Sequence, residues 1–173
     1  MSPRDRLTAL FSPTRRLGGD DPRVLHAGGP LGPVEWVVPR ADCHYRRLDF
    51  SALPARQREA AAQLAARRHE PAPGARQHIA WTGGIAHAWI WAEPDPALAA
   101  DDAGWIPETL LRAPPAADGA RVLQLMRGVE GQVWRDGQLQ ASQWWPAPPD
   151  AEAWRRFARA AGLGPEAVLP AAE

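Results

Sequence analysis

The sequence has few of the features on which disulfide-stabilised and membrane-spanning proteins depend. Among its 173 residues there is a single cysteine, Cys43, which excludes an intramolecular disulfide and fits a reducing compartment. No apolar run in the chain approaches the roughly 20 residues that cross a bilayer. The N-terminal segment MSPRDRLTALFSP lacks the apolar core of a signal peptide. These absences lead us to expect a soluble, cytoplasmic protein.

Lysine is absent, and no excess of either charge takes its place. All 20 basic residues are arginine, 20 acidic residues balance them, and the formal net charge is zero. Nucleic-acid-binding domains typically carry a clustered basic surface, whereas this chain has no sustained basic run. The charge pattern therefore argues against a dedicated nucleic-acid binder.

The spacings that mark metal and catalytic centres are also missing. The chain contains no HxxxH, CxxC or HExxH spacing, no GxSxG elbow and no GxxxxGKS/T loop. Cys43 and His44 are adjacent, but successive residues of a strand point to opposite faces. His78 and His87 lie on either side of a Gly-Gly hairpin signal, across which they could approach each other. We expect no metal, no cofactor and no catalytic residue, and therefore no enzyme.

Tryptophan, by contrast, is abundant, with nine copies in the chain. In one interpretation, these side chains build the core of a protein that has few other large apolar residues. In the other, several of them are exposed as a surface for protein partners or as a platform for stacking sugars. The sequence leaves both interpretations open.

Residues 121–162 contain the clearest pattern, which predicts three short strands followed by one amphipathic helix. Asp136-Gly137 favours the positive φ values of a two-residue hairpin turn. Trp134 and Leu139 should therefore lie opposite each other on one face of the sheet.

The helix of this segment has a defined start and a defined apolar face. A proline-rich stretch ends the last strand, and Asp150 is placed to cap the helix N-terminus. Apolar side chains then recur at i, i+3, i+4 and i+7, the spacing of a stripe that packs on a sheet. They are Trp154, Phe157, Ala158 and Ala161.

Residues 34–104 predict a second set of elements. We expect strands at residues 34–39 and 43–50, the latter near a sheet edge, and a hairpin of residues 77–82 and 85–93 turning at Gly83-Gly84. A helix begins at Ser51 or Leu53 between them. The residues of its expected apolar stripe are Leu53, Ala60 and Leu64. The segment PDPALAADDAG predicts a weak helix or a loop that joins the two halves of the chain.

These patterns predict an α+β fold made of two small lobes of antiparallel sheet with packing helices. Residues 34–104 form the first lobe, in the order ββαββ, and residues 105–162 form the second, in the order βββα. Residues 1–33 have little periodicity and predict a flexible arm. Residues 163–173 predict a tail.

Three stretches of the second lobe carry a resemblance to a known family. They are WIPETLLR at 105–112, RVLQLMRGVEGQVWRDGQLQASQWW at 121–145 and DAEAWRRFARAAG at 150–162. This order resembles the cytoplasmic actin-like domain of the L-type assembly proteins of type II secretion and of the related M-type proteins of type IV pilus assembly. The resemblance implies a reduced actin-like, RNase H-like fold.

For function, the resemblance implies a scaffold at the cytoplasmic face of the inner membrane. Such proteins link an assembly ATPase to membrane components, and many continue into a membrane segment, before which this chain would stop. Actin-like ATPases hold phosphates with DxG loops, for which Asp118-Gly119 and Asp136-Gly137 are the nearest candidates here. Both pairs serve better as turns, so no nucleotide-binding residue is carried over.

We therefore expect a non-enzymatic scaffold that docks other protein subunits, and a homodimer is also compatible. Glu108 and Glu130 occupy polar, backbone-permissive positions from which they could face a partner, although Glu108 also suits a helix N-terminus. The candidate partner-binding residues are Trp89, Trp91, Glu108, Glu130, Trp144 and Trp145. The alternatives are a nucleotide-binding or ATP-hydrolysing actin-like enzyme and a Trp-rich carbohydrate-binding module.

Overall fold

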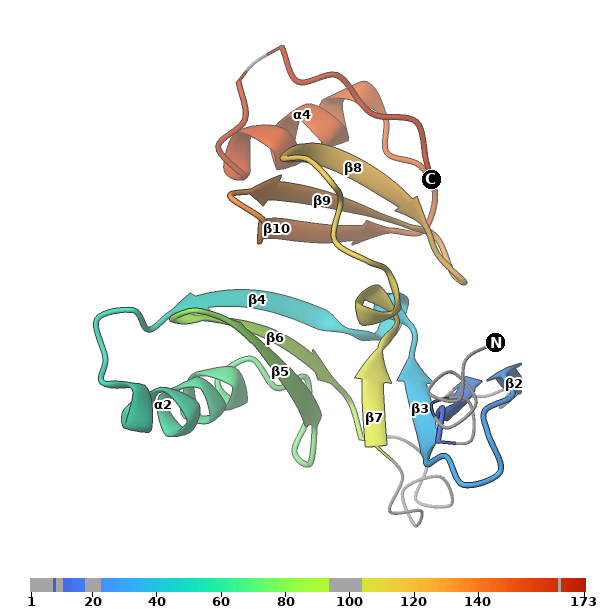
Figure 1. Cartoon of the computed structure of the whole chain (residues 1–173). Coiled ribbons are helices and arrows are strands. Elements are labelled where there is room, and N and C mark those ends of the chain that lie inside the picture. The colour runs from blue at the N-terminus through green and yellow to red at the C-terminus, as the bar shows by residue number, and fades with distance from the viewer. Residues whose placement is uncertain (1–7, 9–10, 18–22, 94–103, 165) are drawn as a thin grey trace.

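The computed structural model describes residues 8, 11–17, 23–93, 104–164 and 166–173, which form an α+β fold. Figure 1 shows four layers stacked from top to bottom: helix α4, a three-stranded upper sheet, a three-stranded lower sheet and helix α2. A four-stranded side sheet lies beside the lower sheet. The helices span Ala55–Arg67 (α2) and Ala151–Ala160 (α4).

The upper and lower sheets are antiparallel, as predicted, with strand orders β10-β9-β8 and β4-β6-β5. Their strands are β4 (His44–Asp49), β5 (Arg76–Thr82), β6 (Ile85–Trp91), β8 (Gly119–Gln124), β9 (Val129–Arg135) and β10 (Gln138–Trp145). Asp136 and Gly137 have φ values of 53° and 67°, which suit a two-residue turn. Trp134 pairs with Leu139, so the predicted hairpin register is confirmed.

The side sheet differs from the expected antiparallel lobe. Its order is β2-β1-β3-β7, and β1, β3 and β7 run parallel. The strands are β1 (Thr14–Leu17), β2 (Val24–His26), β3 (Val34–Val38) and β7 (Gly104–Pro107). Short 3-10 helices follow β3 (η1, Arg40–Asp42) and β7 (η2, Glu108–Leu111). Because η1 turns the chain between β3 and β4, these two strands belong to different sheets.

Three boundaries predicted from the sequence need correction. Parts of residues 1–33 form β1 and β2, and β1 pairs with β3 along its whole length. Strand β7 belongs to the side sheet, so residue 105 does not open the second lobe. The tail is anchored, because Glu173 N–H donates to Val122 O at 2.9 Å and Glu173 O accepts from Gln124 N–H at 2.8 Å. The expected joining segment at 94–103 lies outside the described residues.

Strand β6 is buried along its whole length because both of its faces are covered. Ala88 and Ile90 pack against Ala66 of α2. Trp89 and Trp91, on the opposite face, join a cluster that includes Leu139 of the upper sheet. The lower sheet therefore has a helix on one face and the upper sheet on the other.

Strand β9 divides its side chains between an apolar and a polar face. Val129 and Val133 pack in a cluster with Trp154 of α4. Gly131 lies between them, where an added Cβ would come within 2.7 Å of the Trp145 ring, so the absence of a side chain permits the packing of the tryptophans. The intervening Glu130 belongs to the opposite face, which looks toward the lower sheet.

A β-bulge in β10 changes which side chains face inward. Leu139 and Ala141 are two residues apart and would share a face in a regular strand. The register shifts between them, and Leu139 joins the cluster between the sheets while Ala141 packs toward α4. The same shift places Ser142 on the inner side.

Helix α4 matches its prediction, whereas the apolar face predicted for α2 is wrong. The Asp150 carboxylate accepts from the N–H groups of Glu152 and Ala153 at 3.0 and 2.7 Å. In α2, Ala62 and Ala66 are buried and Leu64 is 60% exposed. Small alanines allow this helix to approach the lower sheet closely, and this packing overrides the expected leucine stripe. Among the described residues, no helix combines the length and apolarity needed to cross a membrane.

We expect Trp154→Ala to destabilise the fold by about 3–5 kcal/mol, because it empties the core between α4 and the upper sheet. Trp154 is 1% exposed and packs against Trp145 and Phe157. Urea unfolding would measure the loss, with Arg155→Ala on the exposed side of α4 as the matched control. If the two variants are equally stable, this core assignment is wrong.

Candidate functional site

A buried ion pair joins the layers at the centre of the molecule. Arg40 Nε donates to Glu130 Oε1 at 2.8 Å, and the two side chains are 5% and 0% exposed. Arg40 belongs to η1, at the end of the side-sheet strand β3, whereas Glu130 lies on β9 of the upper sheet. Residues 90 positions apart in the sequence are thereby fixed in one contact.

The Glu130 carboxylate has further donors on both of its oxygens. Ser142 Oγ donates to Oε1, while Thr109 Oγ1 and Gln132 Nε2 donate to Oε2 at 3.0 and 3.1 Å. The other two guanidinium nitrogens of Arg40 donate to the Cys43 carbonyl oxygen at 2.7 Å and to Ser142 Oγ at 3.0 Å. These hydrogen bonds offset the free-energy cost of removing the two charged side chains from water.

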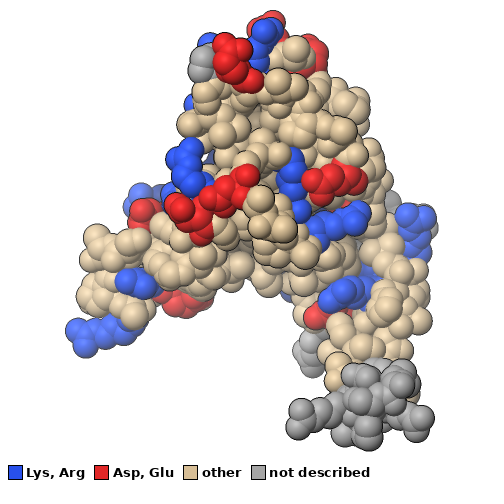
Figure 2. Space-filling model, turned by 45° about the horizontal axis from the view of Figure 1, so that its top comes forward, with Lys and Arg blue, Asp and Glu red and all other residues tan. Residues whose placement is uncertain are grey.

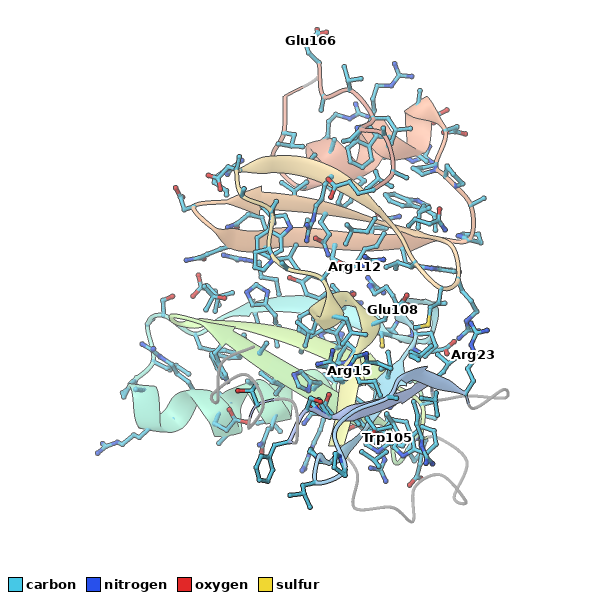
Figure 3. The ribbon with its side chains drawn as sticks, turned by 45° about the vertical axis from the view of Figure 1, so that its right-hand side comes forward. Arg15, Arg23, Trp105, Glu108, Arg112 and Glu166 are labelled. Carbon is cyan, nitrogen blue, oxygen red and sulfur yellow. The ribbon has the colours of Figure 1, made fainter. Side chains whose placement is uncertain are left out.

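Glu108 binds two segments at their backbones. Its Oε2 accepts from Arg40 N–H at 3.1 Å and its Oε1 from Met126 N–H at 2.6 Å. Figure 3 shows Glu108 between the upper and lower layers of strands. The carboxylate thus links η2 both to η1 and to the segment between β8 and β9.

The two 3-10 helices meet because β3 and β7 end at the same level. Val38 and Pro107 are in register in this parallel pair, and each strand then runs through a proline, Pro39 or Pro107, into a 3-10 turn. Parallel neighbouring strands have their carboxyl ends at the same end of the sheet. Arg40 and Glu108, which follow those ends, therefore lie side by side.

A second polar group extends the network along the upper sheet. Gln132 Oε1 accepts from Arg121 Nε at 2.8 Å and from Trp134 Nε1 at 2.9 Å. The Arg121 guanidinium also lies 5.5 Å from the centre of the Trp134 ring. The inner face of the upper sheet therefore combines polar groups with an aromatic wall.

The arrangement links three sheets, and in the described part of the chain its charged groups are paired with one another. The carboxylates of Glu108 and Glu130 are occupied by internal donors. Burial raises the pKa of the Cys43 thiol to about 12, so the thiol stays protonated and cannot act as a nucleophile.

The structure contradicts the prediction that Glu108 and Glu130 face a partner, since their side chains contact this chain's own residues. They lie in segments that look like loops in the sequence but are covered on all sides in the fold. Trp89 and Trp91 are also buried, at 2% and 3% exposure, because the upper sheet covers β6.

Trp144 and Trp145 are the two candidates that retain partial exposure. Trp144 Nε1 donates to the Arg127 carbonyl at 2.7 Å, and Trp145 packs against Trp154 and Phe157. Both are thus held in place by internal contacts.

Other pairings considered from the sequence are not brought together. His78 lies opposite Trp89 and His87 opposite Ala80, so the two histidines are diagonal neighbours rather than a direct cross-strand pair. The described residues contain no group of three or more potential metal ligands. The Asp118 carboxylate accepts from the N–H groups of Asp136 and Gly137, at 2.7 and 3.1 Å. These hydrogen bonds lower the pKa of Asp118. The carboxylate of one Asp-Gly pair therefore caps the turn formed by the other.

Sequence reasoning missed Arg40, Ser142, Thr109 and Gln132. The available signal was the repeated pattern of an apolar strand, a proline and a charged residue, in VEWVVPR and GWIPE. Opposite charges follow Pro39 and Pro107, but only the parallel register of β3 and β7 shows that they lie side by side.

Comparison with solved structures places the chain in the actin-like class of folds. A Bacteroides thetaiotaomicron protein with an actin-like ATPase fold and unknown function matches with a TM-score of 0.53 and 7% identity, over 92% of this chain and 80% of that one. The cytoplasmic domain of EpsL, an inner membrane component of the type II secretion system of Vibrio cholerae, matches with a TM-score of 0.45 and 13% identity, over 78% and 71% of the two chains. No protein-family model and no curated protein matches the sequence.

We expect Glu130→Gln to destabilise the protein by about 3–5 kcal/mol, because the substitution leaves the Arg40 charge buried without its partner. The control is Asp42→Asn, which breaks the exposed pair with Arg127, whose side chains are 44% and 55% exposed, and should cost less than about 1 kcal/mol. Chemical denaturation of both variants tests the difference. Equal losses would refute a central role for the buried pair.

The stability should also depend on His87. Burial, assisted by the charge of Arg47, lowers the pKa of His87 from 6.5 to about 4. Between these two values His87 is protonated in the unfolded chain and neutral in the folded chain. The free energy of unfolding should therefore fall as the pH drops from 6.5 toward 4. Urea unfolding across this range should show a shallower loss for His87→Phe than for the parent chain. Identical pH profiles would contradict the assignment.

Proposed function

We propose that this chain is a non-enzymatic scaffold domain of a bacterial secretion or pilus assembly machine at the cytoplasmic face of the inner membrane. It would hold other protein subunits, among them an assembly ATPase. The proposal combines the resemblance carried by residues 105–162 with the actin-like fold. The observation that carries it furthest is the saturated polar centre around Arg40 and Glu130, which favours a rigid body over a reactive site.

The best-suited docking surface is the free edge of β2. Among the described residues this strand pairs with β1 alone, and its other edge is where a partner's strand would be added. Val24 and Leu25 on this strand are 56% and 37% exposed, and the nearby segments carry Phe11 at 56% and Leu31 at 63%. Four of the six exposed large hydrophobic residues of the described chain thus belong to residues 11–31.

Surface charge favours neither nucleic acid nor an acidic membrane as the partner. Figure 2 shows basic and acidic side chains interspersed on the face that it displays, with uncharged surface between them. A protein partner that adds a strand through main-chain hydrogen bonds does not require a field of one sign.

The nine tryptophans support this proposal over a carbohydrate-binding module. Each is buried or partly buried, and none belongs to the exposed class. Stacking platforms for sugars need open aromatic faces, whereas these rings serve the clusters between the layers.

We expect Val24→Arg to weaken binding of the cognate assembly ATPase at least about tenfold, because a charge would replace an apolar contact at the docking edge. The matched control is Leu64→Arg, at a residue that is 60% exposed on α2, far along the chain from β2. Biolayer interferometry with the immobilised chain would measure both affinities.

Equal affinities for the two variants would exclude the β2 edge as the docking surface. A large thermal stabilisation of the parent chain by ATP and magnesium would contradict the non-enzymatic proposal and favour a nucleotide-binding enzyme. A shift of tryptophan fluorescence with oligosaccharides would instead favour the carbohydrate-binding alternative.

A further inference from the structure

A cavity of about 180 Å³ lies between the upper and lower sheets, apart from the Arg40–Glu130 pair. Trp89, Trp134 and Leu139 supply apolar wall, and the polar lining includes His87, Arg121 and Gln132. In Figure 3, Arg112, which also lines the cavity, lies between the two layers of strands. The scaffold proposal makes no use of this space.

The cavity contains buried hydrogen-bond donors that have no acceptor. Tyr45 OH and His87 Nδ1 are 2.9 Å apart. The Tyr45 hydroxyl can donate to Nδ1, and in that tautomer the imidazole proton is on Nε2. That Nε2 and the indole Nε1 of Trp89 are both buried, with no partner among the described residues. The indole Nε1 groups of Trp36, Trp91, Trp105 and Trp154 also lack a partner among the described residues, so it is the adjoining cavity that distinguishes His87 and Trp89.

Arg121 adds a buried positive charge to the same lining. It is 8% exposed, and its described hydrogen bonds go to neutral oxygens, Gln132 Oε1 at 2.8 Å and Ala113 O at 3.0 Å. No carboxylate of the described residues lies within ion-pairing distance of its guanidinium, whereas the carboxylate of Glu130 is paired with Arg40. Glu173 and Glu130 act on this charge from beyond ion-pairing distance, so an anion in the cavity would give the guanidinium a direct partner.

The lining also selects the type of anion. It contains no aspartate or glutamate, and its aromatic rings suit a flat or compact hydrocarbon body. The volume is below the roughly 300–1,000 Å³ of sites for drug-sized ligands, which favours a small molecule.

We propose that this cavity is a binding site for a small carboxylate with an apolar or aromatic body. The carboxylate accepts hydrogen bonds from Arg121 and from His87 Nε2. The hydrocarbon part occupies the space between Trp89 and Trp134.

Benzoate is a suitable probe, and benzamide is its neutral isostere. Titration of the full chain, followed by ¹⁵N–¹H spectra of the histidine and indole groups, should show saturable shifts at His87 Nε2 and Trp89 Nε1. Benzoate should bind at least about tenfold more tightly than benzamide, because hydrogen bonds to a charged acceptor are stronger.

Two variants test the donors. Arg121→Gln and His87→Phe should each weaken benzoate binding about tenfold or more, whereas Arg155→Gln on the exposed side of α4 should leave it unchanged. Thermal melting identifies any variant that fails to fold. The comparison of benzoate with benzamide on the parent chain needs no variant and keeps the test decisive.

Equal affinity for benzoate and benzamide would overturn the proposal, as would the absence of saturable shifts up to the solubility limit of sodium benzoate. A crystal structure at saturating benzoate that shows only ordered water beside His87 would overturn it as well. None of these outcomes involves the β2 edge, so they are independent of the docking experiment.

Discussion

The ion pair between Arg40 and Glu130 is the constraint on which the arrangement of the three sheets depends. Removing two charges from water is costly, and the cost is offset only if every donor and acceptor finds a partner. Thr109, Gln132 and Ser142 supply those partners from three different elements. Apolar packing between the upper and lower sheets is not directional. We infer that the polar centre fixes how these layers are oriented, because a sliding movement would leave a charge without its partner.

This division of labour bears on function. In the described chain, the buried polar side chains bind one another, and six of the nine tryptophans pack in the clusters between layers. The exposed apolar side chains gather instead around the edge strand β2. A rigid interior with an exposed apolar sheet edge is the combination expected of a scaffold, whereas the cavity beside His87 and Arg121 offers a separate place for a small anion.

Local patterns allowed much of the fold to be predicted. Some features depend only on residues that are close in the sequence and can therefore be predicted from it. They are the turn at Asp136-Gly137, the helix cap at Asp150 and the apolar stripe that contains Trp154. The side sheet could not be predicted in the same way, because β1, β3 and β7 are parallel and their pairing is non-local. The site was missed for the same reason. Glu130 looks like a loop residue in the sequence, and its partner Arg40 is 90 positions away.

The parallel arrangement of β1, β3 and β7 has a mechanical consequence. Tension applied along neighbouring parallel strands loads their cross-strand hydrogen bonds together, in shear, rather than breaking them one at a time. The chain leaves β3 and β7 through Pro39 and Pro107, directly before Arg40 and Glu108. A load entering at β2 would therefore pass through the side sheet into the buried network and on to the upper sheet.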